Sequence, residues 1–75
     1  MKKFVTEKLK NFGSNVKNYR LAKGLSVKEL AKLSGLKQAY IYKIERGEAY
    51  GLNIDHVYFL AKGLKIKPHE LVDGI

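Results

Sequence analysis

The chain has 75 residues, of which 45% are hydrophobic, and 15 basic against seven acidic residues give it a formal net charge of +8. This length allows a single domain with one core, and the apolar content is too high for a disordered tail. The absence of cysteine excludes disulfides and thiolate zinc sites, and no apolar run approaches the ~20 residues of a membrane helix. We therefore expect a soluble intracellular domain with no membrane partner. The basic excess favours nucleic acid as the partner, with a solvated lysine-rich surface as the alternative.

A first helix is predicted over about residues 11–23, where Phe12, Val16 and Tyr19 recur on one face at spacings of four and three. Gly24 then has the character of a left-handed residue that ends a helix.

The first ten residues form an N-terminal extension of the domain, which itself is expected over residues 11–75. Val5 and Leu9 continue the helical spacing of the first helix toward the N-terminus. The extension is therefore either a lysine-rich arm or further turns of that helix, and the sequence leaves both open.

A second helix begins after Ser26, which is a good N-cap, and Glu29 three residues later completes a capping box. It buries Leu30, and Ala31 is small enough for another helix to approach closely. Residues 34–36 then make a tight turn containing a glycine.

The third helix is predicted from about Gln38 to Arg46. Ile41 and Ile44 point inward, with Tyr40 along the same seam, and Gly47 closes the helix.

Asn53 is the expected cap of a fourth helix. Pro68 suits the first turn of a last short helix over 68–72, because its missing N–H has no partner to lose there. The apolar positions of the fourth helix are Ile54, Val57, Tyr58, Leu60, Ala61 and Leu64.

Catalytic groups are scarce. His56 and His69 lie on different predicted helices, and neither has a carboxylate or a second histidine at ligand spacing. No serine stands in a nucleophile elbow or a phosphate-binding loop. We expect ordinary surface or partly buried histidines, no enzyme, no metal or cofactor, and no small-molecule ligand.

The two helices joined by a short glycine-containing turn predict a helix-turn-helix, in which the second helix stands out from the body. On a basic chain, such a projecting helix favours insertion into the major groove of DNA. An ordinary three-helix core without a ligand is the alternative, and spacing alone does not separate the two.

The chain resembles the phage Cro and repressor type of helix-turn-helix domain, often called the XRE family, over about residues 12–72. The residues that carry the resemblance are Phe12-Gly13, Val16, Tyr19-Arg20, Gly24-Leu25-Ser26, Leu30-Ala31, Gly35, Ile41, Ile44-Glu45-Arg46-Gly47, Leu60-Ala61 and Leu64. The resemblance implies an all-α, five-helix, phage-repressor-like domain with its helix-turn-helix at about residues 27–46. It also implies a bacterial or phage-encoded, nucleoid-associated cytoplasmic regulator that binds double-stranded operator DNA, most often as a repressor on a short palindrome.

By the same resemblance, the base-reading positions fall at the start and along the outward face of the third helix. Gln38 can contact adenine through both its amide atoms, and Lys37 and Lys43 can reach guanine or phosphate. The remaining positions are Ala39, whose methyl group suits thymine, and Tyr42, which suits phosphate or sugar. An ordinary solvated helix face is the alternative for Tyr42 and Lys43.

The resemblance also implies phosphate contacts and an ion pair that stabilises the motif. Arg46 and Asn53 match positions that touch phosphates, and Tyr50 is a weaker candidate between them. Arg20 and Glu45 should pair between the first and third helices and brace the motif, with an isolated surface ion pair as the alternative.

Three residues depart from the family pattern. Val27 stands where a phosphate-binding glutamine is common, Lys37 replaces the usual serine or threonine cap, and Glu48 lies in a loop that is often basic. We interpret Val27 as the loss of one phosphate anchor and of a support for Gln38.

Dimerisation is expected from the C-terminal end, which commonly forms the twofold interface in this family. The expected interface residues are Ile66, Leu71, Val72 and Ile75, and the alternative is that they close the core of the monomer.

Two rival functions remain. A protein-interaction module or the antitoxin of a toxin–antitoxin pair would use the same motif for assembly. A non-specific binder of polyanions or membrane surfaces would carry one basic amphipathic stripe, whereas the lysines here are scattered.

Overall fold

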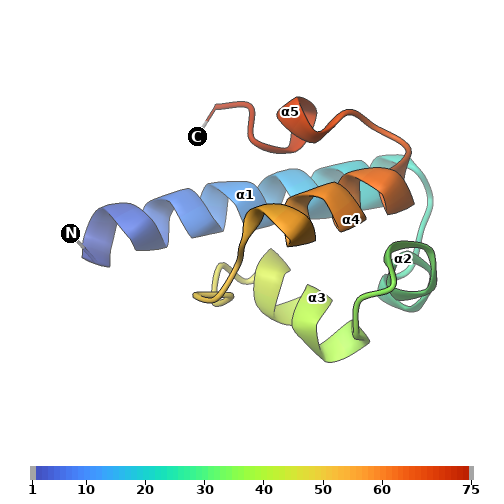
Figure 1. The fold of residues 1–75 in the computed structure, drawn as a ribbon, viewed down its shortest axis with the longest axis horizontal. Coiled ribbons are helices and arrows are strands. Elements are labelled where there is room, and N and C mark those ends of the chain that lie inside the picture. The colour runs from blue at the N-terminus through green and yellow to red at the C-terminus, as the bar shows by residue number, and fades with distance from the viewer. Residues whose placement is uncertain (1, 75) are drawn as a thin grey trace.

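The computed structural model describes the backbone of residues 2–74 and the side chains of residues 6–74. Within that range it has five helices and no strand, which confirms the expected all-α fold class. They are α1 (Lys2–Ala22), α2 (Val27–Ser34), α3 (Gln38–Glu45), α4 (Ile54–Leu64) and α5 (Pro68–Leu71). In Figure 1, α1 runs along the length of the molecule, with α5 on one side and α3 and α2 on the other. No helix among the described residues is long and apolar enough to cross a membrane.

Helix α1 is longer than the helix predicted from the apolar spacing. It continues without a break through residues 2–10, which the sequence left as either arm or helix. Its end lies where expected: Gly24 has a φ of 69°, and the Leu25 amide donates to the Arg20 carbonyl at 3.0 Å. This pair of features closes the last turn of α1.

The core lies where α1, α2, α3 and α4 meet. Large side chains with less than 2% exposure come from every one of these helices and from α5. The largest of them are Leu30, Ile41, Ile44, Leu60, Leu64, Leu71 and Val16.

Helix α1 crosses the C-terminal end of α3 at Gly13. A Cβ atom at this position would overlap the backbone oxygen of Ile44 and lie 2.9 Å from that of Glu45. Only a residue without a side chain allows this approach, so Gly13 fixes how closely α1 and α3 pack.

Helices α2 and α4 pack with similar closeness. A Cβ atom on Gly63 would lie 3.1 Å from the Ser34 amide and 3.2 Å from a methyl group of Leu30. The first helix of the motif, α2, is therefore held against α4 nearly backbone to backbone.

The C-terminal segment is tied to α1 by one side chain. The Asn15 amide nitrogen donates to the Leu71 carbonyl at 2.8 Å and to the Asp73 carbonyl at 3.0 Å. These bonds satisfy carbonyls at the end of α5, which no helical amide can reach.

Candidate nucleic-acid interface

The predicted capping box of α2 and the glycine-containing turn after it are present. The Glu29 amide donates to Ser26 Oγ at 3.0 Å, and the Ser26 amide donates to Glu29 Oε1 at 2.9 Å, which completes the capping box. Gly35 has a φ of 78°, a left-handed conformation that most side chains disfavour, so this turn favours glycine. The Leu36 amide donates to Ser34 Oγ at 3.2 Å. Together these contacts orient α3 relative to α2.

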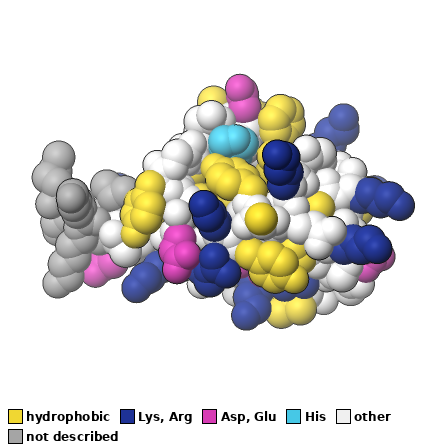
Figure 2. Space-filling model, turned by 90° about the horizontal axis from the view of Figure 1, so that it is seen from below, with side chains coloured by type: hydrophobic (Ala, Val, Ile, Leu, Met, Phe, Trp, Pro, Cys, Tyr) yellow, Lys and Arg dark blue, Asp and Glu magenta, His cyan; other side chains and the backbone are white. Residues whose placement is uncertain are grey.

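Helix α3 has one buried and one open face. Ile41 and Ile44 are 0% and 1% exposed and anchor it to the core. The positions expected to read bases are all exposed, and Tyr42 keeps 50% of its surface. They are Lys37, Gln38, Ala39, Tyr42 and Lys43. Figure 2 views the molecule from the side of α2 and α3, where Lys and Arg side chains are spread over the surface with hydrophobic side chains between them.

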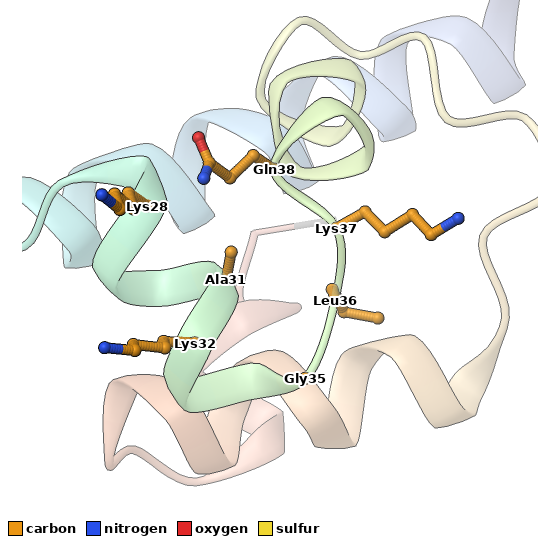
Figure 3. A pocket seen from close by; sticks show the side chains of 7 residues that line it. All are labelled: Lys28, Ala31, Lys32, Gly35, Leu36, Lys37 and Gln38. Carbon is orange, nitrogen blue, oxygen red and sulfur yellow. The ribbon is translucent and has the colours of Figure 1, made fainter.

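Two lysines of α2 border the start of α3, and the sequence interpretation missed them. An open pocket is lined by Lys28, Lys32, Lys37 and Gln38 together with the apolar residues and the glycine between them. Figure 3 shows the side chains of Lys28, Lys32 and Gln38 pointing to one side of the pocket, whereas Lys37 points to the other. The spacing of four between Lys28 and Lys32, on the side of α2 away from Leu30, is the signal that would have found them.

The N-terminus of α3 carries no side-chain cap, as expected from the lysine there. Lys37 adopts an extended conformation, with φ −73° and ψ 145°, and makes no capping hydrogen bond. The first amides of α3 are therefore left to a solvent molecule or an anion.

Tyr40 links α3 to α4. Its hydroxyl lies 3.2 Å from His56 Nδ1, the same atom that accepts from the Asn53 amide at 3.2 Å, and the two rings are 4.9 Å apart. The Asn53 side chain in turn accepts from the His56 amide at 3.2 Å and caps α4. Burial raises the pKa of the Tyr40 hydroxyl. His56 is therefore a structural residue of the α4 cap.

Arg20 and Glu45 form the expected pair. Arg20 Nε donates to Glu45 Oε2 at 2.7 Å and Nη2 donates to Oε1 at 3.0 Å, while Nη1 donates to the Leu25 carbonyl at 2.9 Å. The two side chains are only 11% and 8% exposed. The hydrogen bonds that Arg20 donates to the Glu45 carboxylate raise the pKa of the Arg20 guanidinium. Glu45 thus turns inward from the open face of α3 and braces α3 against α1.

The three residues expected at phosphates lie beyond the C-terminal end of α3. Arg46 makes an exposed ion pair with Glu48 at 3.2 Å, Tyr50 is 69% exposed, and Asn53 uses its side-chain oxygen as the α4 cap. The side-chain nitrogen of Asn53 remains a donor toward solvent. The guanidinium of Arg46 lies next to the carboxylate of Glu48.

Val27 has a physical reason to be apolar. It is 6% exposed and belongs to the core cluster, at the first position of α2. The interpretation of this position as a missing phosphate anchor was incomplete, because the side chain contributes to the core instead.

The prediction that Leu71 lies at a dimer interface is wrong, and the alternative that it closes the core of the monomer holds for this residue. This side chain is 0% exposed and offers no surface to a partner, because it fills the core beneath α5. Ile66 is partly buried against the same core, and Val72 keeps 43% of its surface. Ile75 lies outside the described residues.

Comparison with known proteins gives consistent matches. A family model described as helix-turn-helix matches residues 16–71. The HTH-type transcriptional regulator SinR of Bacillus subtilis (strain 168) is 33% identical over 61 residues, which are 81% of this chain and 55% of SinR. This chain therefore spans about half the length of that relative.

Two solved structures resemble the fold closely. The restriction-modification controller protein C.AhdI from Aeromonas hydrophila is 41% identical with a TM-score of 0.80, over 84% of this chain and 94% of its own. The wild-type restriction-modification controller protein C.Esp1396I is 32% identical with a TM-score of 0.77, over 84% of this chain and 82% of its own.

Proposed function

The chain belongs to the XRE-type helix-turn-helix family of DNA-binding transcriptional regulators, and from this premise we propose that it recognises a short palindromic operator as a dimer and represses transcription there. Each protomer inserts α3 into the major groove of one half-site. Two such helices related by a twofold axis read half-sites about one helical turn apart.

The observation that carries this proposal is the division of α3 into two faces. Ile41 and Ile44 are buried in the core, whereas the polar side chains at the start of the helix make no hydrogen bond or ion pair with any described residue. Gln38 presents an amide that can donate to adenine N7 and accept from the adenine amino group. Lys37 and Lys43 provide cations for guanine or phosphate on either side of it.

Phosphate contacts position the domain on the duplex. Arg46, Tyr50 and Asn53 lie on the loop after α3, and Lys28 and Lys32 lie on α2 beside Gln38. One group thus precedes α3 in the sequence and the other follows it. Because phosphates are the same in every sequence, such contacts add affinity without specificity.

Selection of bound DNA from a random pool, followed by titration at several salt concentrations, tests the proposal. We expect an enriched palindrome. Gln38→Ala should weaken binding to it by about 1–3 kcal/mol and leave random DNA unaffected, whereas Arg46→Ala should weaken both. If no motif is enriched and the two variants behave alike, sequence-specific recognition is wrong.

Glu48 gives this experiment an internal check. Its carboxylate pairs with Arg46 on an exposed surface, where such a pair contributes at most ~1 kcal/mol to stability. Glu48→Gln should therefore leave stability unchanged and strengthen binding to both DNAs, because it releases Arg46 and removes a negative charge near the phosphates.

The two solved structures support a narrower role. Both are restriction-modification controller proteins, and the first is 41% identical to this chain. We propose that the genes under control encode a restriction–modification system. Mapping of the bound sites in the native genome tests this: a site upstream of such genes is expected, and sites only at unrelated genes would overturn it.

A further inference from the structure

The chain that leaves α3 lies against α1 at a second glycine, Gly47. A Cβ atom on Gly47 would lie 2.6 Å from Lys10 Cγ, 2.9 Å from Lys10 Cα and 3.1 Å from the Lys10 amide nitrogen. Gly47 also has a φ of 75°, so both the space and the backbone conformation favour glycine there. The stem of Lys10 therefore lies directly on the backbone that follows α3.

This contact gathers three charged residues around Gly47. Arg46 and Glu48 are its neighbours in the chain, and Lys10 is packed against it from α1. Arg46 and Glu48 form an exposed ion pair at 3.2 Å. Lys10 is exposed as well, and its ammonium group makes no ion pair or hydrogen bond with any described residue. Lys10 is therefore a cation at the end of α3 that no described neighbour neutralises.

Lys10 lies beside the residues that we propose at DNA phosphates. Arg46 directly precedes Gly47, and Tyr50 and Asn53 follow on the loop between α3 and α4. Figure 1 shows this loop next to the N-terminal half of α1, in agreement with the contact between Lys10 and Gly47. A lysine carries its ammonium group on a flexible four-carbon stem. Lys10 can therefore extend toward a phosphate that neighbours the one bound by Arg46.

A purely structural role for Lys10 at the end of α3 is the alternative. The last carbonyl groups of a helix carry partial negative charge, which a nearby cation stabilises. Two of these carbonyls already have backbone partners, because the Gly47 amide donates to Ile44 at 3.0 Å and the Glu48 amide donates to Lys43 at 2.9 Å. The ammonium group of Lys10 is thus not required to cap them, which favours a partner outside the domain.

We propose that Lys10 binds a DNA phosphate next to the one bound by Arg46, so that α1 adds a contact with the DNA backbone beside the loop after α3. This rests on the proposed function, since it requires α3 to lie in the major groove. Lys10 is the last residue of the N-terminal extension, and the helix-turn-helix family model matches only residues 16–71. The contact therefore comes from a part of the chain outside the matched region and gives the extension a role in binding.

Salt titration of two matched variants tests the contact. Lys10→Met removes the charge and keeps most of the stem. Lys8→Met makes the same change at an exposed lysine of the same helix, about 200° further round it, and is the control. Each phosphate neutralised by a protein contributes about 0.9 to the slope of log affinity against log salt concentration. On a duplex with one half-site, we expect Lys10→Met to lower this slope by about 0.9 and Lys8→Met to leave it nearly unchanged.

Neutral phosphates locate the contact on the DNA. A methylphosphonate linkage, which carries no charge, is placed at one position of the half-site at a time. For the unmodified chain, each linkage at a contacted phosphate should weaken binding several-fold. One of these losses should disappear in Lys10→Met and a neighbouring one in Arg46→Met, because a contact that has already lost its cation cannot be lost again. Lys8→Met should retain every loss seen with the unmodified chain.

Urea denaturation separates the phosphate contact from the structural alternative. We expect Lys10→Met and Lys8→Met to have nearly the same free energy of unfolding. If Lys10→Met is less stable than Lys8→Met and its salt slope is unchanged, Lys10 serves only the end of α3 and the proposed contact is wrong. Equal salt slopes for the two variants, or a methylphosphonate profile that Lys10→Met does not alter, would also overturn it.

The outcomes distinguish this inference from the proposed function. If a palindrome is enriched and both lysine variants bind it like the unmodified chain, the Lys10 contact is wrong while operator recognition is supported. If no sequence is enriched but Lys10→Met alone lowers the salt slope on random DNA, the contact is supported and the proposed function is contradicted. When both hold, Lys10→Met should weaken binding to the operator and to random DNA by the same factor, because phosphates carry no sequence information.

Discussion

The two ends of α3 are held in very different ways. At the C-terminal end, the backbone lies against Gly13 of α1 and Glu45 is clasped by Arg20. At the N-terminal end, Lys37 makes no capping bond, and the main side-chain support is the contact of Tyr40 with His56. The end that sets the angle of the helix is fixed by backbone contact and a buried ion pair. The end that carries Gln38 keeps its amides and side chains available to a ligand.

The largest change in stability is expected from a substitution that disturbs the packing of α1 against the C-terminal end of α3. Gly13→Ala places a Cβ atom against the carbonyl oxygens of Ile44 and Glu45, and neither backbone can move without separating α1 from α3. We expect a loss of about 3 kcal/mol or more in the free energy of unfolding, measured by urea denaturation. Gly51→Ala is the control, because a Cβ atom there meets nothing within 4 Å. Equal effects of the two substitutions would contradict the close packing at Gly13.

The next effect concerns the buried ion pair. Arg20→Met leaves Glu45 buried without its partner, and we expect a cost of about 3 kcal/mol in the free energy of unfolding. Arg46→Met breaks the exposed pair with Glu48 and should cost less than about 1 kcal/mol. The two variants compare an ion pair that holds α3 against α1 with an ion pair on the exposed surface. Similar losses for both would mean that Arg20 does not brace α3.

A smaller change in stability is expected from a substitution near the N-terminal end of α3. Tyr40→Phe removes the hydroxyl next to His56 and keeps the ring, so the free energy of unfolding should fall by about 1 kcal/mol. Binding to the selected operator should weaken more than binding to random DNA, because the start of α3 carries Gln38. Tyr42→Phe, on the exposed face of the same helix, should leave stability unchanged. A Tyr40→Phe variant that weakens both DNAs equally would show that Tyr40 does not position the reading end.

The smallest effect is a dependence of stability on pH at the start of α2. Hydrogen bonds from the Ser26 backbone and side chain lower the pKa of Glu29 below its ordinary value of 4.5. A group with a lowered pKa stabilises the fold above its ordinary pKa and loses this contribution as the pH falls through the lowered one. Glu29→Gln should remove this contribution, so the unfolding curves of the variant and the unmodified chain should converge toward acid pH. A constant difference at all pH values would contradict this assignment.

Local chemistry made much of the fold predictable. The caps at Ser26 and Asn53 and the glycine in the turn depend on neighbours within four residues, and the spacing of Ile41 and Ile44 indicates the inward side of α3. Such rules act before tertiary packing and can be read from a short window of sequence. The polar face of α3 follows from the same spacing.

The features missed by the sequence interpretation depend on residues far apart in the chain. The role of Gly13 requires knowing that α1 crosses α3, and the link from Tyr40 to His56 requires the path of the loop between their helices. Val27 was interpreted only as a missing phosphate anchor, and Leu71 was expected at a dimer interface with closure of the monomer core as the alternative, because spacing along the chain does not tell which neighbour covers a side chain. The exposed apolar side chains of α4 could be recognised only once the buried side of that helix was known.

The tie from Asn15 to the C-terminal segment has a consequence for the order of folding. Its two hydrogen bonds join residues 56 and 58 positions apart, so they can form only after the chain between them has closed. Helix α5 has four residues and cannot persist without this closure. We therefore expect α5 to form last and open first, with the fastest amide hydrogen exchange of the five helices. Asn15→Ala should raise that exchange rate further while leaving the amides of α2 and α3 protected.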